Sequence, residues 1–444
     1  MEQNLGNRWR FVGAALVMQL CLGVLYSWAV FRGPLATLNE WTPAVTVQPY
    51  KYSLFFFTVA MIFAGFWQDK KGPRLVGSVG GILLGTGCLI AAFSVSSSPG
   101  LIFAYGILGG LGVGFAYVTP IATCVKWFPD KRGMIVGLAV MGFGAGSLIF
   151  APLLETLIGF ERLEAQGLTG AAFNSALAGN LKTTFITMAV IFYICVIGAA
   201  QVYRVPPAGW RPEGWAPPAT AGAPTKEDFS PLEMLKTWQF WALWIIYFFG
   251  SATGQVAIGQ GKPIVGQAIA NAKASGAFWL TGGWTLGIMA AFNGLGRLFW
   301  GSLSDKLGRN VTTVLMYSVY IITCVFVISY GVLNQAYTPI LLGLCLIGFA
   351  YGGYLAMMPS FCADYYGSKN VGANYGILFS AWGISALVFT QVFAKIITAA
   401  KAVGTPEALA GGYKTVYYSL AALSVVGLIL AIIVKRPMHE VKSD

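Results

Sequence analysis

Apolar residues come in long runs along the whole chain, and short polar segments separate these runs. A helix of about 20 predominantly apolar residues crosses a bilayer, so each run is a predicted transmembrane helix. Twelve runs have this character: 11–31, 50–67, 75–94, 101–125, 133–158, 183–203, 238–258, 278–301, 311–331, 339–361, 374–398 and 415–434. The pattern predicts an all-α polytopic membrane protein with twelve transmembrane helices.

One polar segment, residues 204–236, divides these helices into six and six. It is rich in proline, glycine and alanine and carries charges of both signs, which is typical of a linker. We therefore expect an N-terminal six-helix bundle over 1–203, a cytoplasmic linker over 204–236, and a C-terminal six-helix bundle over 237–444.

Two short motifs occur once in each half. D-K-x-G appears in "GFWQDKKGPR" (65–74) after the second run and in "GSLSDKLGR" (301–309) after the eighth. "GFAY" occurs at 114–117 and again at 348–351, so the two motifs repeat at offsets of 236 and 234 residues. Nearly equal offsets indicate two pseudo-symmetric halves, an organisation that secondary transporters use to form a site at the repeat interface.

The duplicated D-K-x-G loops must turn sharply between two helices. A glycine permits such a turn, and an aspartate there can face a helix N-terminus or a nearby arginine. The motif resembles the loop signature of the major facilitator superfamily, which implies a gating role without substrate contact. The alternative is a pair of basic loops that only follow membrane topology. The residues assigned to gating or structure are Asp69, Gly72, Arg74, Asp305, Gly308 and Arg309.

Composition and charge agree with a membrane protein. Hydrophobic residues make up 57% and charged residues 10% of the chain, whereas soluble proteins carry about 25% charged residues. The net charge of +12 comes from lysines and arginines in short loops, which does not indicate nucleic-acid binding. With the N-terminus inside, 18 of them lie in the tails and cytoplasmic loops and 8 in external loops. This asymmetry predicts an integral cell-membrane protein with both termini in the cytoplasm.

Several classes of chemistry have no residues to support them. The single histidine, His439, lies in the C-terminal tail, and the seven cysteines show neither metal-binding nor disulfide spacing. The sequence contains no phosphate-binding G-x-x-x-x-G-K-[ST] motif. We therefore expect a gradient-driven transporter and not an enzyme, with no cofactor. The expected partners are a small substrate and the lipid bilayer, with no nucleic acid, and we expect the protein to function as a monomer.

Arg297 lies inside the eighth apolar run. A charged side chain at the bilayer centre costs between about 3 and more than 10 kcal/mol, and arginine stays protonated, so it must face a polar cavity or a partner. Asn293 lies on the same helical face but is neutral. The equivalent position of the first half is Met61, so the charge belongs to one half only, and an anionic substrate is its natural complement. The alternative is that Arg297 snorkels to the cytoplasmic surface near Asp305.

Other polar groups lie near the predicted spans. Those near span centres are Tyr26, Tyr117, Tyr351 and Trp382; their polar atoms need partners, as an aqueous cavity or ordinary packing would provide. Glu155 and Lys395 lie near external ends, where snorkelling is expected. Asp364 lies at a cytoplasmic end, where we expect it to contact the duplicated loops.

Several segments together resemble the oxalate/formate antiporter family within the major facilitator superfamily. They are "NLGNRWRF", "LYSW", "GVGFAY", "KWFPDKRG", "EMLKTWQFW", "NGLGRLFWGSLSDKLGR" and "NYG". The resemblance implies that Arg297 matches an arginine of the family's eighth helix, and that Tyr26, Tyr117, Tyr351 and Phe379 line the cavity. The family also has a lysine eight residues after the asparagine of "NYG", where this chain has Trp382.

The missing second cation favours a monocarboxylate such as lactate, pyruvate, formate or acetate, because one planar guanidinium fits one carboxylate. We expect alternating access with exchange, because the loaded site is easier to enclose than the empty one. Related proton-coupled monocarboxylate porters have an aspartate four residues before the arginine, where Asn293 cannot titrate. The alternatives are a proton-coupled symporter, an oxalate or dicarboxylate exchanger, a drug exporter and a non-transporting sensor. The expected substrate-binding residues are Arg297, Tyr26, Tyr117, Tyr351, Trp382, Asn293 and Phe379.

Overall fold

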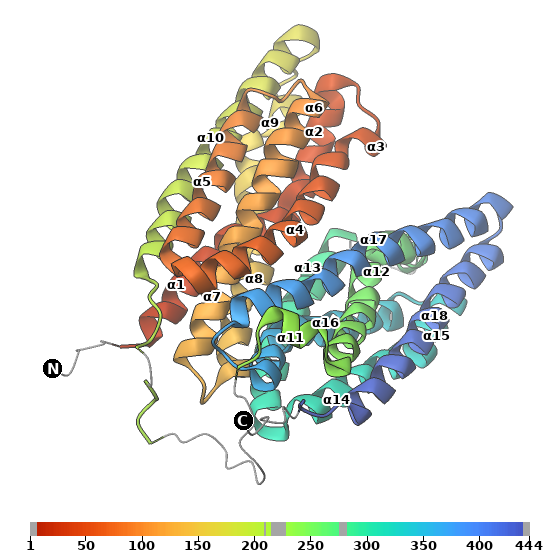
Figure 1. The fold of residues 1–444 in the computed structure, drawn as a ribbon. Coiled ribbons are helices and arrows are strands. Elements are labelled where there is room, and N and C mark those ends of the chain that lie inside the picture. The colour runs from red at the N-terminus through yellow and green to blue at the C-terminus, as the bar shows by residue number, and fades with distance from the viewer. Residues whose placement is uncertain (1–6, 208–209, 215–227, 275–281, 438–444) are drawn as a thin grey trace. The chain divides into compact units, whose positions relative to one another are not determined.

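The structure is a computed structural model. It describes the backbone of residues 7–207, 210–214, 228–274 and 282–437, and their side chains except those of 43–44, 259–263 and 265–286. All regular structure in these parts of the chain is helical (Figure 1).

The helices of the first half follow one another with short connections. They are α1 (Trp9–Leu22), α2 (Ala29–Asn39), α3 (Pro43–Thr46), α4 (Gln48–Lys71), α5 (Pro73–Ala92), α6 (Ser98–Leu101), α7 (Gly110–Trp127), α8 (Arg132–Ile158), α9 (Phe160–Ala165) and α10 (Gly170–Val202). A 3₁₀ segment, Gly23–Trp28, joins α1 to α2, and a π-helical segment, Ile102–Gly109, precedes α7.

The helices of the second half begin after the linker. They are α11 (Pro231–Leu235), α12 (Trp238–Ala274), α13 (Gly282–Leu307), α14 (Arg309–Ile322), α15 (Ser329–Leu333), α16 (Tyr337–Tyr366), α17 (Val371–Val403) and α18 (Pro406–Ile433). A π-helical segment, Thr323–Ile328, separates α14 from α15.

Eleven spans among the described residues are long and apolar enough to cross a membrane. The eighth predicted run, 278–301, begins outside the described residues and continues in α13. The predicted all-helical polytopic fold is therefore confirmed. Several helices extend beyond their apolar runs: α10 begins at Gly170 and not near residue 183, because alanine-rich sequence continues the helix.

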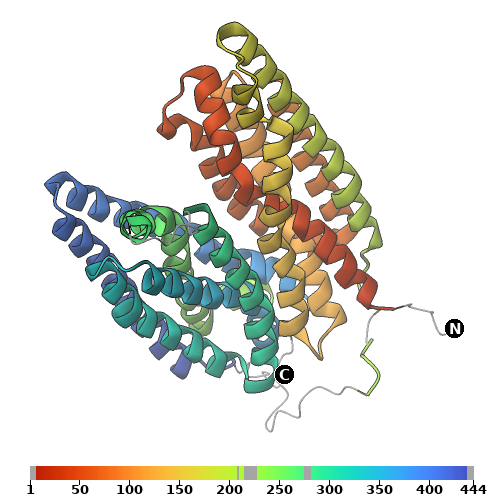
Figure 2. The same ribbon diagram turned by 180° about the vertical axis from the view of Figure 1, so that it is seen from behind.

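The helices form two compact units. The first consists of Met1–Trp127, Ala139–Pro212 and Lys369–Ile377, and the second of Phe128–Leu138, Glu213–Ser368 and Leu378–Asp444. In the first unit, α5 packs beside α7 and α10; in the second, α13 packs along α16 (Figures 1 and 2). Each unit includes a short segment from the other half of the sequence. The domain limits 1–203, 204–236 and 237–444 stay a prediction.

The two D-K-x-G loops have the same backbone conformation. Gly72 ends α4 with φ 86°, and Gly308 ends α13 with φ 87°. This left-handed region favours glycine, because a side chain there is strained. Each glycine lets one helix end and the next begin within one residue, and this places Asp69 and Asp305 in the last turn before the bend.

Candidate functional site

Arg297 lies in α13 and its side chain is completely buried. The alternative in which it reaches the aqueous surface therefore does not describe this structure. The Oδ1 atom of Asn293 accepts hydrogen bonds from its Nε at 3.2 Å and its Nη2 at 3.1 Å. The acceptor is a neutral amide, so these bonds orient the guanidinium without neutralising its charge. Asn293 is itself held by its Nδ2, which donates to the carbonyl of Gly348 at 3.0 Å.

Small residues let neighbouring helices approach this arginine closely. A Cβ on Gly352 of α16 would lie 2.1 Å from the Asn293 carbonyl oxygen and 3.1 Å from Cγ of Arg297. A Cβ on Gly137 of α8 would lie 2.3 Å from the Arg297 carbonyl oxygen. Contacts this short exclude any side chain at either position, so the glycines bring the α16 and α8 backbones against Arg297.

Three aromatic side chains of α16 and α17 contact one another. The Nε1 of Trp382 donates to the hydroxyl of Tyr351 at 2.7 Å, and Phe379 stacks on Trp382 with ring centroids 5.1 Å apart. All three side chains are buried. Tyr351 adjoins Gly352, the residue that packs on Arg297. The second unit therefore contains five of the predicted substrate residues in two groups: Asn293 with Arg297, and Tyr351 with Phe379 and Trp382.

The other two predicted substrate residues meet in the first unit. The rings of Tyr26 and Tyr117 each contact Phe143 edge-on, both with ring centroids 5.2 Å apart. Phe57 packs edge-on against Tyr117 at 5.1 Å. Phe57 and Phe143 were not predicted, because phenylalanine is common in apolar runs.

A buried glutamine in each unit was also missed. The Nε2 of Gln255 donates to the Trp382 carbonyl at 2.9 Å, and the Nε2 of Gln19 donates to the Tyr117 carbonyl at 3.4 Å. Each therefore holds the backbone of a predicted cavity residue. The two glutamines lie 236 residues apart, which is the offset of the duplicated loops. That coincidence was a signal in the sequence that could have identified them.

Asp69 binds the start of α17. Its Oδ2 accepts from the backbone N–H of Ala373 at 2.8 Å, and its Oδ1 accepts from Lys126 at 2.8 Å. Lys126 also donates to the carbonyl of Lys369 at 3.2 Å. A carboxylate at a helix N-terminus is favourable because unpaired N–H groups and the helix dipole both attract it. We call Asp69, Lys126 and the start of α17 the first latch.

Asp305 binds the start of α8 in the corresponding way. Its carboxylate accepts from the backbone N–H groups of Gly133 at 2.9 Å and Met134 at 2.8 Å, and Arg309 lies 2.8 Å away. Asp364 accepts from both Arg309 at 2.7 Å and Arg132 at 2.6 Å. We call Asp305, Arg309, Asp364, Arg132 and the start of α8 the second latch.

The arginines of the two loops therefore have different partners. Arg309 pairs with carboxylates, whereas Arg74 donates from its Nε to the carbonyl of Tyr203 at 2.9 Å. Asp364 contacts the second loop as predicted. Lys126 and Arg132 were not assigned individually, although both lie in the segment "KWFPDKRG".

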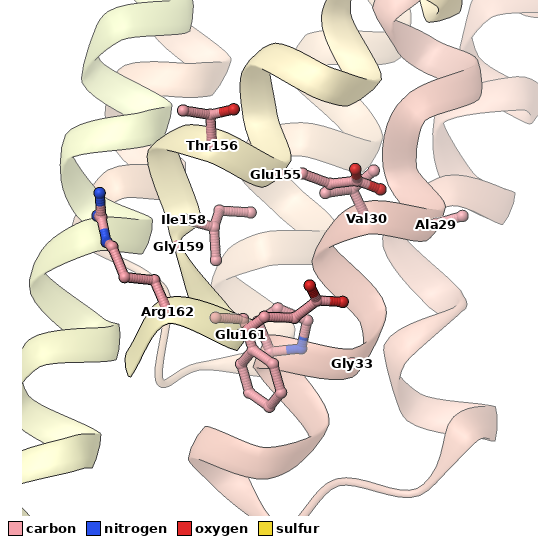
Figure 3. Close-up of a pocket in the computed structure, with 11 residues that line it drawn as sticks. Ala29, Val30, Gly33, Glu155, Thr156, Ile158, Gly159, Glu161 and Arg162 are labelled. Carbon is pink, nitrogen blue, oxygen red and sulfur yellow. The ribbon is translucent and has the colours of Figure 1, made fainter. Parts of the chain in front are cut away.

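A separate cavity of about 570 Å³ lies beside α2 and the α8–α9 junction in the first unit. Figure 3 shows the carboxylates of Glu155 and Glu161 directed toward α2 and Arg162 directed away. Glu155 is exposed. None of the predicted substrate residues lines this cavity.

Residues 26–390 match the family model of the Major Facilitator Superfamily. The chain belongs to this superfamily. The oxalate:formate antiporter of Oxalobacter formigenes is 30% identical over 397 residues, which cover 89% of this chain and 86% of that protein. Apicoplast pyruvate carrier 1 of Toxoplasma gondii is 24% identical over 391 residues, covering 78% and 68%.

Solved structures of the superfamily share the fold. The crystal structure of the transporter FucP in the outward conformation aligns with a TM-score of 0.67 and 14% identity, covering 96% of this chain and 99% of that one. The predicted resemblance to the oxalate/formate antiporter family is confirmed, and so is the prediction of an integral membrane transporter and not an enzyme.

Proposed function

We propose that this protein carries small monocarboxylates across the cell membrane by alternating access, with the substrate carboxylate bound to Arg297. The observation that carries the proposal is the completely buried guanidinium of Arg297 in α13, the helix that contains most of the eighth predicted run, where the neutral amide of Asn293 accepts from it. The guanidinium stays charged, and its planar fork suits a carboxylate. An anion is therefore the ligand that this position favours.

The group around Trp382 supports a substrate with one carboxylate. Trp382 replaces the second cation that the family resemblance would place there, and it stacks on Phe379 while donating to Tyr351. One cation and an apolar wall suit a monoanion with a small apolar body, such as lactate or pyruvate. The names of the two relatives, an oxalate:formate antiporter and a pyruvate carrier, support a small carboxylate.

The 30% sequence identity to the oxalate:formate antiporter favours a second candidate function, exchange of oxalate or another dicarboxylate. A dianion at Arg297 would have one carboxylate without the second cation that the family resemblance places at Trp382, and a buried charge without a partner is costly. Competition between mono- and dicarboxylates in proteoliposomes therefore decides between the candidates.

The two latches supply the gates in this proposal. Each loop aspartate binds the first turn of a helix from the other half of the sequence. Release of these bonds would open a cytoplasmic path, with both termini on that side as the loop charges favour. The latches do not take part in selecting the substrate.

The test is transport by purified protein in liposomes, with Arg297→Gln as the central variant. We expect Arg297→Gln to reduce lactate and pyruvate exchange at least about a hundredfold, because a charge-assisted bidentate contact is lost. Arg297→Lys keeps the charge but lacks the planar fork, so we expect an intermediate loss. Arg211→Gln changes an exposed arginine of the linker and is the matched control. Intact carboxylate exchange by Arg297→Gln would refute the site.

A further inference from the structure

The linker between the halves is attached to the first unit at its beginning. The Nε1 of Trp127 donates to the carbonyl of Arg204 at 2.7 Å. The ring of Trp210 packs edge-on against the buried ring of Trp127, with centroids 4.7 Å apart. A buried tryptophan at the end of α7 therefore holds the first residues of the linker.

The linker is attached to the second unit at its end. The backbone N–H of Phe229 donates to the carbonyl of Tyr366 at 2.9 Å, and its ring packs edge-on against Tyr366 at 5.4 Å. The side chain of Phe229 is only 3% exposed. The hydroxyls of Thr237 and Tyr366 lie 3.1 Å apart. The last turn of α16 thus holds this end through backbone, ring and hydroxyl contacts.

Both attachments lie on the turns that carry latch residues. Trp127 directly follows Lys126 of the first latch, and Tyr366 is two residues after Asp364 of the second. Chain connectivity alone does not require this, because the linker needs only to join α10 to α12. The docked ends stabilise the same two helix ends whose ion pairs form the latches.

The length of the linker decides how it could act. Seventeen residues lie between Arg211 and Phe229, and a segment of this length can extend to about 60 Å. A connection that long does not limit relative motion by being pulled tight. Any influence on the gates must therefore act through the docked ends themselves.

We propose that the two docked ends of the linker act as a regulatory strap, in which packing of Trp210 on Trp127 and of Phe229 on Tyr366 stabilises the two latches in their ion-paired form. Undocking either end loosens the adjoining helix end and makes its latch easier to open. This inference rests on the gating role proposed for the latches. It does not depend on the identity of the substrate.

Two native cysteines allow the strap to be tested directly. Cys124 and Cys362 each lie two residues before a latch residue, and both are completely buried. Maleimide labelling of the full-length protein in nanodiscs, quantified for each cysteine by mass spectrometry, reports opening of each helix end. Because an edge-to-face aromatic contact is modest, we expect Phe229→Ala to label Cys362 about three- to tenfold faster. Trp210→Ala should do the same at Cys124.

Three comparisons make the result decisive. Leu232→Ala changes a residue of the same segment that is 73% exposed, and it should leave labelling unchanged. Cys345, buried in α16 away from the latch, should also stay unchanged in Phe229→Ala; an equal rise there means general loosening and overturns the strap. Phe229→Leu is a milder variant that should give a smaller increase at Cys362.

Asp364→Asn separates failure of the strap from failure of the latch. If Asp364→Asn speeds labelling of Cys362 and Phe229→Ala does not, the strap is wrong and the latch stands. If neither variant changes the labelling rate of Cys362, the gating role of the latch is wrong, and the strap proposal that rests on it is wrong as well. Substrate is absent from the assay, so an error in the carboxylate assignment affects neither result.

Discussion

At the scale of single residues, the neutral amide of Asn293 contacts the Arg297 guanidinium directly. Its Oδ1 accepts from two guanidinium nitrogens, so Asn293→Asp would place a carboxylate where the neutral acceptor now lies. That carboxylate would compete with the substrate for the guanidinium. We expect the KM for lactate to rise about tenfold or more at neutral pH. It should fall as the pH is lowered, because protonation of the new carboxyl group restores a neutral acceptor.

The matched control is Asn293→Ser, which is smaller but also neutral. Its KM should change without acquiring a pH dependence between pH 5.5 and 8. Initial exchange rates across that range, measured at several lactate concentrations, distinguish the two variants. An Asn293→Asp protein with the pH profile of the parent would show that this position does not influence the substrate anion.

Single residues also show how far the sequence can predict a site. Arg297 could be singled out as a candidate because a charge in an apolar run is costly wherever its side chain points. Phe57 and Phe143 were not, since their chemistry resembles that of ordinary packing residues, and only the structure brings them onto Tyr117. The hydrogen bond from Trp382 to Tyr351 joins positions 31 residues apart on different helices, which no local pattern specifies.

At the scale of helices, the close contact between α13 and α16 shapes the surroundings of Arg297. Gly352→Ala would force a methyl group to within 2.1 Å of the Asn293 carbonyl oxygen, so the two backbones must separate. Overpacking of this kind costs about 1–3 kcal/mol. We expect a thermal midpoint lower by a few degrees in detergent and a loss of transport. The control is Gly287→Ala in α13. A Cβ at Gly287 would have no atom of the described residues within 4 Å, so this change should be neutral or slightly stabilising.

Helix positions were largely predictable, because the bilayer imposes a long apolar run on each one. The ends of the helices were harder to predict from the sequence. Polar residues at a membrane surface can continue a helix, as at the start of α10, and the 3₁₀ segment Gly23–Trp28 interrupts a run that looks uniform. Apolar patterning reports burial in lipid, not the hydrogen bonding at each turn.

At the scale of the whole molecule, the duplicated halves exchange contacts through their loops. Asp69 binds the start of α17 and Asp305 binds the start of α8. The repeat offset was visible in the sequence, but the partner of Asp69 lies 304 residues away. The sequence therefore indicated that the two loops are equivalent, whereas the structure identified which helix each one binds.

For the whole molecule we also predict that transport occurs by exchange of one substrate for another. Enclosing the site means removing water from the Arg297 guanidinium, and a bound carboxylate lowers that electrostatic cost by adding the opposite charge. The loaded carrier should therefore reorient faster than the empty one. Uptake of labelled lactate should be at least about tenfold faster into liposomes preloaded with lactate than into empty ones. Equal initial rates, with no internal anion and no pH gradient, would contradict exchange and favour net transport. Repeating both measurements with Arg297→Lys tests the cause. A lysine, unlike an arginine, can lose its proton when it is buried without an anion, so the difference in uptake rate between loaded and empty liposomes should become smaller.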